Sequence, residues 1–158
     1  VNPALPKQKH MRWAAFLKNA GTEDAVQILK DLKLDNDTIT RVRTLNQWIY
    51  RTILPEKTEI RRAMSQMEDS LFDDLLILKD SLGEPGVEKL ERLKGEIRRD
   101  GDCLRLKNLA VSGRDLMEAG VQPGKQVGEE LARLLDAVLE EPGKNQKDVL
   151  LGMILKGR

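Results

Sequence analysis

The chain has 158 residues, with 40% hydrophobic side chains, 34% charged side chains and a formal net charge of +1. A chain of this length can bury a core in one domain or two small ones, and its composition argues against disorder. The near-neutral charge excludes a uniformly basic surface that coats a polyanion, and no apolar run is long enough to span a membrane.

Aliphatic residues must fill the core, because aromatic residues make up only 3% of the chain. Such a core favours helices, and no hairpin pattern interrupts the helical spacing of the apolar residues. In chain order we expect helices over residues 11–19, 22–32, 35–54, 58–67, 71–78, 87–97, 112–119, 127–139 and from 146 onward. The predicted fold is all-α, a compact multi-helix domain with a C-terminal helix–turn–helix-like tail. A helical body-like region is expected over residues 1–102 and the tail over residues 103–158.

Polar residues before several of these helices predict where the helices begin. Thr22 and Asp35 have the position and the chemistry of N-caps, and Pro55 is expected to end the helix that Asp35 begins. Asn145, with Asp148 three residues later, has the capping pattern of the last helix.

A glycine-rich turn in the last third of the chain carries its most specific local pattern. Ser112 and Asp115 have the S-x-x-D spacing of a helix N-cap, and Gly120 suits the left-handed residue after a short helix. Gly124 permits a tight turn into the next helix. Gly128 leaves room for another backbone beside the first turn of that helix.

The same pattern predicts the packing and the chemistry of this turn. Leu116 and Met117 are expected to face a core. Lys125 stands at the start of the next helix, where exposed backbone N–H groups attract anions, so the turn favours a phosphate site. An ordinary corner between two helices, whose glycines serve only packing, is the alternative that these residues leave open.

A longer run of residues around the turn has a characteristic order and spacing. It consists of Leu109-Ala110-Val111-Ser112-Gly113-Arg114-Asp115-Leu116-Met117, then Gly120-Val121, Pro123-Gly124, Gly128, Leu131, Leu134-Leu135, Val138-Leu139, Asn145 and Leu150-Leu151. This run resembles the C-terminal part of bacterial class II CCA-adding tRNA nucleotidyltransferases, within the poly(A) polymerase superfamily. Upstream, Arg12-Trp13-Ala14-Ala15-Phe16-Leu17 and Gly21 are similar to a segment in which many relatives carry a His-Asp pair, whose place Lys18-Asn19 takes here.

The resemblance implies a helical body and tail that bind tRNA along its acceptor–elbow side and position its 3′ end for CCA or A addition. A catalytic head outside this chain would add the nucleotides, so tRNA and that head are the expected partners. No cofactor is expected in this chain, and Mg²⁺ is expected only in the head. The resemblance leaves a homo-oligomer open and implies no membrane partner.

The location of the protein is expected to be cytoplasmic. Cys103 is the only cysteine and cannot form an internal disulfide, which fits a reducing compartment. The first seven residues lack an apolar stretch, so the sequence predicts no signal peptide.

Basic side chains are the expected tRNA contacts, because folded RNA is recognised largely through its shape and its phosphates. In the tail these residues are Arg105, Lys107, Arg114 and Lys125, beside Gly124 and Gly128. Along the third and fourth expected helices they are Arg41, Arg43, Arg51, Arg61 and Arg62. Trp13 and Trp48 are available for base stacking, although a Trp in an amphipathic helix is more often a core residue.

The sequence offers no residues with the setting that nucleotidyl transfer requires, which is a pair of carboxylates that hold divalent metals. Asp35 and Asp37 have D-x-D spacing, as do Asp100 and Asp102. Neither pair follows a Gly-Ser turn in a strand, as the metal carboxylates of the resembled family do. His10 is the only histidine, so a zinc site is not expected either. Whether the chain is an enzyme by itself is left open.

Two other classes of protein share parts of this pattern. Helix-hairpin-helix modules, which hold DNA phosphates, have a similar Gly-x-x-Pro-Gly stretch, although Lys125-Gln126 replaces their second glycine. A helical scaffold that binds only protein is the other class. Residues 1–62 hold twelve Lys or Arg against seven Asp or Glu, whereas residues 63–102 hold six against eleven. A basic strip near Gly124 favours nucleic acid, and scattered charge favours the scaffold.

Overall fold

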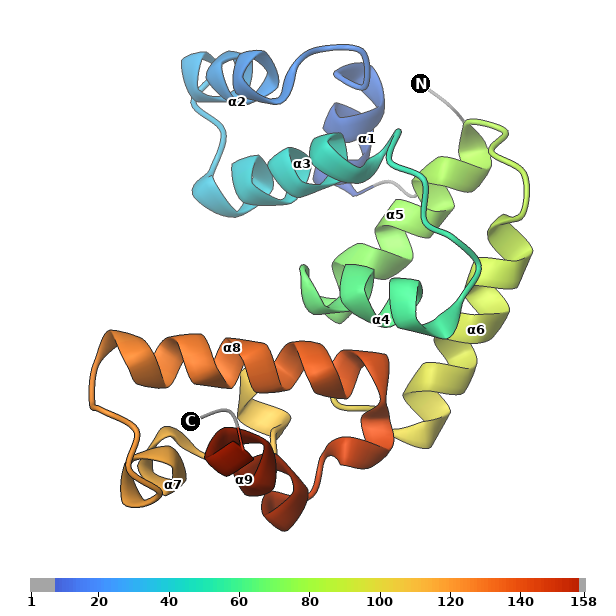
Figure 1. Ribbon diagram of the computed structural model, residues 1–158. Helices are drawn as coiled ribbons and strands as arrows, with labels where there is room; N and C mark the ends of the chain where they lie inside the picture. Colours follow the sequence, from blue (N-terminus) through green and yellow to red (C-terminus); the bar gives the residue numbers. More distant parts are fainter. Residues whose placement is uncertain (1–7, 157–158) are drawn as a thin grey trace. The chain divides into compact units, whose positions relative to one another are not determined.

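The computed structural model describes residues 8–156, which form helices and the connections between them (Figure 1). The α-helices are α1 (Lys9–Phe16), α2 (Thr22–Asp31), α3 (Asn36–Trp48), α4 (Lys57–Ser65), α5 (Asp69–Ser81), α6 (Val87–Asp100), α7 (Gly113–Glu118), α8 (Lys125–Glu140) and α9 (Lys147–Lys156), with short 3₁₀ helices η1 (Leu106–Asn108) and η2 (Pro142–Lys144). No strand occurs in this described range, so the all-α prediction is confirmed. The segment in which the sequence predicts no signal peptide lies outside the described residues.

The described chain divides into two compact units. Unit 1 contains residues 8–55 and 66–93, and unit 2 contains residues 56–65 and 94–156. The expected division at residue 102 into a body-like region and a tail stays a prediction. Among the helices of residues 8–156, none combines the length and the apolar character that a membrane crossing requires.

In unit 1, the helices α1 and α2 both pack against α3 (Figure 1). Their buried aliphatic side chains form one cluster, made of Leu17, Ala25, Val26, Leu29, Ile39 and Val42. Trp13 is partly buried and packs against this cluster. Trp13 therefore contributes to the core, as expected of a Trp in an amphipathic helix. The helical spacing of the apolar residues therefore predicts these three helices well.

The start of α3 confirms the N-cap predicted at Asp35. Its carboxylate accepts the backbone N–H of Thr38 at 3.0 Å and the ammonium of Lys9 at 2.7 Å. These donors, the Lys9 ammonium first, hold the pKa of Asp35 well below its ordinary value. The cap predicted at Thr22 is wrong by one residue, because Gly21 holds the cap position and the Thr22 hydroxyl donates to a side chain of α3 instead.

The end of α3 comes earlier than the sequence predicts, at Trp48 rather than at Pro55. Lys79 of α5, whose side chain is fully buried, gives the physical reason. Its Nζ donates to the carbonyl oxygens of Ile49 at 3.3 Å and Arg51 at 2.7 Å. These carbonyls therefore have hydrogen-bond partners without a further helical turn.

In unit 2, α8 packs against α4, α7 and η1. One hydrophobic cluster of this unit is made of nine buried residues: Cys103, Leu109, Val111, Leu116, Val121, Leu134, Val138, Leu150 and Ile154. Burial raises the pKa of the Cys103 thiol, so this cysteine is a packing residue with little thiolate character. Most of these core residues belong to the run on which the family resemblance depends, which means that the resemblance rests largely on core-forming positions.

Candidate nucleic-acid interface

The short helix α7 begins with the capping box that the sequence predicts. The Ser112 hydroxyl accepts the backbone N–H of Asp115 at 3.2 Å, and the Asp115 carboxylate accepts the backbone N–H of Ser112 at 2.8 Å. Lys147 of α9 lies 3.2 Å from the same carboxylate. The Ser112 N–H, followed by Lys147, lowers the pKa of Asp115. The box therefore fixes the start of α7 and also links it to α9.

Two glycines of the turn have the backbone conformations that the sequence predicts. Gly120 ends α7 at a φ of 101°, and the N–H of Val121 donates back to the carbonyl of Leu116 at 2.9 Å. Gly124 has a φ of 98° and a ψ of −135°, a backbone conformation that residues other than glycine rarely adopt. Since Gly124 has no side-chain donor or acceptor, α8 begins without a side-chain cap.

The role of Gly128 differs from the sequence prediction. A Cβ atom built on this residue would meet no atom within 4 Å, so the described residues place no other backbone beside it. The close approach is made at Gly113 instead, where a Cβ would lie 3.1 Å from Cγ1 of Val127. The first turn of α8 near Gly128 is thus open to whatever binds there.

The prediction that Leu116 and Met117 both face the core is confirmed for one residue and wrong for the other. Leu116 is fully buried, whereas 44% of Met117 is exposed. Consecutive residues of an α-helix point about 100° apart, and α7 is too short to bury more than one side. This exposure leaves an apolar side chain three residues from Arg114, the basic residue of α7.

Of the four basic tail residues that the sequence predicts as tRNA contacts, three are well exposed, namely Lys107, Arg114 and Lys125. The Arg114 side chain is 86% exposed and lies 3.5 Å from Glu118, and the Lys125 side chain is 90% exposed and lies 3.7 Å from Glu129. Such exposed pairs contribute little free energy, so both cations remain available to a phosphate. Arg105 is half-buried.

The basic residues predicted along the third and fourth helices have different surroundings. In unit 1, Arg43 is exposed, and Arg51 is exposed with its guanidinium 4.4 Å from the Trp48 ring centroid. Arg41 is engaged by carboxylates of Asp37 at 3.0 Å and Glu68 at 3.1 Å. The pKa of Arg41 is raised by these partners, Asp37 first.

Arg61 and Arg62 belong to unit 2, together with the turn, but only one of them can reach a ligand. The Arg61 side chain is 7% exposed, and its guanidinium donates to backbone oxygens of α8 and to Asp102. Arg62 has 40% of its side chain exposed and lies 3.5 Å from Asp136. We therefore assign Arg61 a structural role and leave it out of the interface.

The carboxylates with D-x-D spacing all have cationic neighbours. Asp35 pairs with Lys9, Asp37 with Arg41, Asp100 with Lys57 and Asp102 with Arg61, at 2.7, 3.0, 4.0 and 3.3 Å. Within residues 8–156, no three His, Cys, Asp or Glu side chains come together as a metal site would require. Each of these aspartates thus has a structural explanation.

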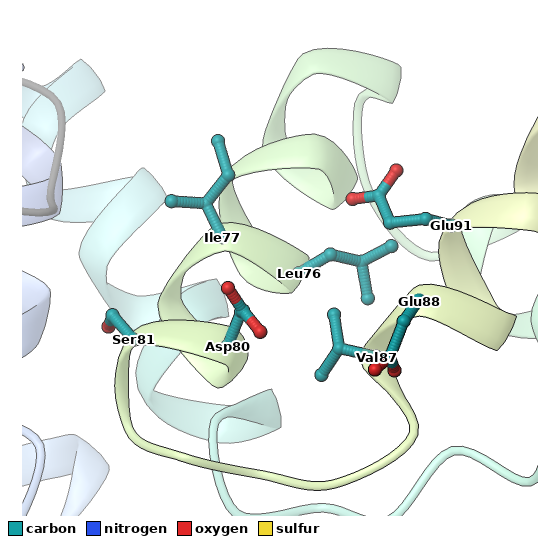
Figure 2. A pocket seen from close by; sticks show the side chains of 7 residues that line it. All are labelled: Leu76, Ile77, Asp80, Ser81, Val87, Glu88 and Glu91. Atoms are coloured by element: carbon teal, nitrogen blue, oxygen red, sulfur yellow. The ribbon is translucent and has the colours of Figure 1, made fainter.

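Unit 1 also contains a hollow of about 360 Å³ between α5 and α6 (Figure 2). Three apolar side chains, three carboxylates and one serine line it: Leu76, Ile77, Val87, Asp80, Glu88, Glu91 and Ser81. Because carboxylates repel phosphates, this hollow is unsuited to RNA, and it is not part of the candidate interface.

Sequence reasoning missed two kinds of residue. Asn145, predicted as a helix cap, instead uses its side-chain amide to accept the N–H of Ala110 at 2.8 Å and to donate to the carbonyl of Asn108 at 3.0 Å. It thereby holds η1, the 3₁₀ helix that carries Lys107, in place. The exposed rings of Phe16 and Tyr50 in unit 1 were also missed, because only Trp13 and Trp48 were considered for stacking. Both rings fall in stretches of sequence that have no acidic residue.

Comparison with known proteins identifies a family for this chain. The family described as tRNA nucleotidyltransferase domain 2 matches residues 6–154, which is nearly the whole chain. No curated protein and no solved structure matches the chain.

Proposed function

The chain belongs to the family of tRNA nucleotidyltransferase domain 2, and we propose that it binds tRNA and positions the 3′ end for nucleotide addition. A catalytic head outside this chain carries out the addition and holds the Mg²⁺ ions that nucleotidyl transfer needs. The head also decides whether CCA, A alone or a poly(A) tail is added. This RNA-binding role is exercised in the cytoplasm.

The single observation that carries this proposal is the exposed turn of unit 2. Arg114 and Lys125 lie on either side of the glycine turn, both with nearly complete exposure, and α8 begins at Lys125 without a side-chain cap. Backbone N–H groups at such a start, with the positive end of a 16-residue helix behind them, favour a phosphate oxygen. Gly128, in the first turn of α8, has no side chain that would block the approach of a ligand, and the space beside it is open.

Folded RNA suits this surface better than a specific DNA sequence. The turn offers cations and backbone N–H groups, which contact phosphates, and these groups do not read base edges. Recognition of a folded tRNA depends mainly on shape and on phosphate positions. The mixed charge of the whole chain further restricts phosphate contacts to particular places on its surface.

Salt-dependent binding of tRNA tests the proposal. We would measure fluorescence anisotropy of a labelled tRNA that lacks its 3′ CCA, over a series of salt concentrations. Each of Arg114→Ala and Lys125→Ala is expected to lower the magnitude of the log–log salt slope by about one, because each removes one phosphate contact. Arg133→Ala is the matched control, since Arg133 is exposed on α8 but pairs with Glu130 beyond the first turn.

Three results would contradict the proposal. Equal slopes for Arg114→Ala, Lys125→Ala and Arg133→Ala would remove the turn from the interface. Duplex DNA binding as tight as tRNA binding would favour the helix-hairpin-helix alternative. The absence of salt-dependent binding to either nucleic acid would favour a protein scaffold. Circular dichroism of each variant separates these results from loss of folding.

A second measurement tests whether catalysis belongs to the absent head. The chain alone is expected to add no labelled CTP or ATP to the same tRNA in the presence of Mg²⁺, because its D-x-D carboxylates are engaged by cations. Incorporation that persists through purification to homogeneity, and that Asp35→Asn or Asp102→Asn abolishes, would show that the chain is itself an enzyme.

A further inference from the structure

Two stretches of unit 1 have no acidic residue and lie side by side. Residues 8–22 and residues 38–55 include no Asp or Glu, although acidic residues make up 26 of the 158 positions in the chain. The first stretch forms α1 and the second forms most of α3, and these two helices pack together (Figure 1). The two stretches thus contribute no carboxylate to this surface, although Asp35 pairs with Lys9 and the Asp74 carboxylate lies 2.7 Å from His10.

Hydrogen bonds fix the two stretches to each other at the ends of their helices. The Asn46 amide donates to the carbonyl oxygens of Leu17 at 3.3 Å and Ala20 at 3.0 Å. The Tyr50 hydroxyl donates to the side-chain oxygen of Asn19 at 3.0 Å. The ends of α1 and α3 are therefore held together, with Tyr50 at the place where they meet.

Most of the aromatic residues of the chain gather in these two stretches. The chain has only five, and four of them, Trp13, Phe16, Trp48 and Tyr50, lie here. Phe16 is 78% exposed and Tyr50 is 62% exposed, whereas the fifth aromatic residue, Phe72, is fully buried. Trp13 supports Phe16 from the side, with the ring centroids 6.0 Å apart at 87°. The rings of Phe16 and Tyr50 are therefore exposed to solvent, while aliphatic residues fill most of the core.

Unpaired cations flank the exposed rings. Arg12 precedes Phe16 by four residues on the exposed side of α1. Arg43 and Gln47 are exposed four residues apart on α3, and Tyr50 is exposed just after α3 ends at Trp48. Neither Arg12 nor Arg43 forms an ion pair with any residue between 8 and 156. Both guanidinium groups are therefore free to meet an anion.

We propose that Phe16 and Tyr50 form a stacking surface for unpaired RNA bases, and that Arg12 and Arg43 contact the phosphates that flank those bases. Aromatic rings bind unstacked bases through their faces, and nearby cations bind the backbone, which is how proteins commonly hold single-stranded RNA. The lack of carboxylates within the two stretches favours a polyanion over a protein partner. This inference rests on the proposed function and adds a second contact, in unit 1, with the single-stranded parts of a tRNA.

The test uses the complete chain and a short single-stranded RNA in which 2-aminopurine replaces one adenine. Stacking on a ring is expected to change the 2-aminopurine fluorescence on binding. Phe16→Leu and Tyr50→Leu keep apolar side chains but remove the rings, and each is expected to weaken binding about five-fold or more. Phe16→Tyr keeps a ring and is expected to bind within about two-fold of the unchanged chain, because stacking requires only the ring face.

Leu32→Ala is the matched control. Leu32 is 53% exposed in the same unit, but it lies at the end of α2 and next to acidic Asp31. Its replacement is expected to leave RNA binding unchanged. An equal loss in Phe16→Leu and Leu32→Ala would overturn the inference, and so would Phe16→Leu binding as tightly as the unchanged chain, because an apolar docking site for protein tolerates leucine.

The outcomes for this site and for the turn of unit 2 are distinguishable. Binding of tRNA that responds to Arg114→Ala and Lys125→Ala but not to Phe16→Leu or Tyr50→Leu would overturn the stacking surface and leave the proposed function intact. A chain that binds neither tRNA nor single-stranded RNA would overturn both.

Discussion

Arg61 in α4 donates a hydrogen bond from Nε to the carbonyl oxygen of Leu139 in the last turn of α8. A second donor of the same guanidinium bonds the carbonyl of Glu140 at 3.1 Å, and Asp102 balances its charge at 3.3 Å. The last carbonyls of a helix have no partner within the helix, and α8 has no basic residue in its own last turn. Arg61 therefore caps α8 from another helix.

We expect Arg61→Ala to lower the free energy of unfolding by about 3 kcal/mol or more, because it leaves a half-buried carboxylate and two carbonyls without their donor. Urea denaturation followed by circular dichroism measures this loss. Arg62→Ala, at the neighbouring and more exposed position, is expected to cost less than about 1 kcal/mol. Similar losses in the two variants would contradict the capping role.

Leu116 and Met117 offer a second matched pair in α7. Leu116→Ala is expected to destabilise the chain by about 2–5 kcal/mol, since it opens a cavity in a fully packed site. Met117→Ala removes a side chain that is 44% exposed and is expected to change stability by about 0.5 kcal/mol or less. Thermal unfolding of both variants measures the two losses of stability. A larger loss in Met117→Ala than in Leu116→Ala would mean that α7 is rotated about its axis.

The two glycines that flank the start of α8 are expected to respond in opposite directions. Gly124→Ala should lower the unfolding free energy by about 1–3 kcal/mol, because alanine rarely adopts a positive φ and this cost does not depend on free space. Gly128→Ala should raise it by about 0.5–1 kcal/mol, since Gly128 lies inside a helix with open space around it.

The same pair separates folding from RNA binding. If an RNA backbone approaches α8 at Gly128, then Gly128→Ala weakens tRNA binding while it stabilises the fold. Unfolding curves and anisotropy titrations on one preparation give both quantities. Unchanged affinity in Gly128→Ala would limit the contact to the cations and the turn.

Asp115 predicts a dependence of stability on pH. Its pKa is lower in the folded chain than the usual value of about 3.9, so the folded state is favoured above that value and loses this contribution as the pH falls through the lowered pKa. The difference in stability between the unchanged chain and Asp115→Asn should therefore be full near pH 7 and shrink below about pH 4. A stability difference that grows as the pH falls would contradict a lowered pKa for Asp115 in the folded chain.

The sequence predicts most of the helices because local chemistry decides them. Asp35, the Ser112–Asp115 pair and the two turn glycines act within three or four residues, and the structure confirms all of them. The apolar spacing also identifies the residues that are buried. What it does not reveal is whether a buried residue is helical, since Ile49 and Ile53 are both buried although α3 ends before them.

The errors come from contacts between distant parts of the chain. Lys79 bonds carbonyls 28 and 30 residues away, and Asn145 bonds groups 35 and 37 residues away. No local pattern contains such partners, so the end of α3 and the role of Asn145 were predicted wrongly. The basic residues of the candidate site were chosen by charge alone, which does not separate a buried guanidinium such as Arg61 from an exposed one such as Arg114.

The hydrogen bonds from Lys79 to the chain after α3 also fix the backbone on both sides of Tyr50. The Lys79 ammonium binds the carbonyls of Ile49 and Arg51, the residues immediately before and after Tyr50, and Glu84 neutralises it at 3.1 Å. The backbone that carries the exposed ring is thus ordered before any ligand arrives. A ligand that stacks on this ring gives up little of its binding free energy to conformational entropy of the protein. Lys79→Met removes these hydrogen bonds and leaves the Tyr50 ring intact. Binding to Tyr50 would then cost more conformational entropy, because the backbone around the ring would have to become ordered on binding.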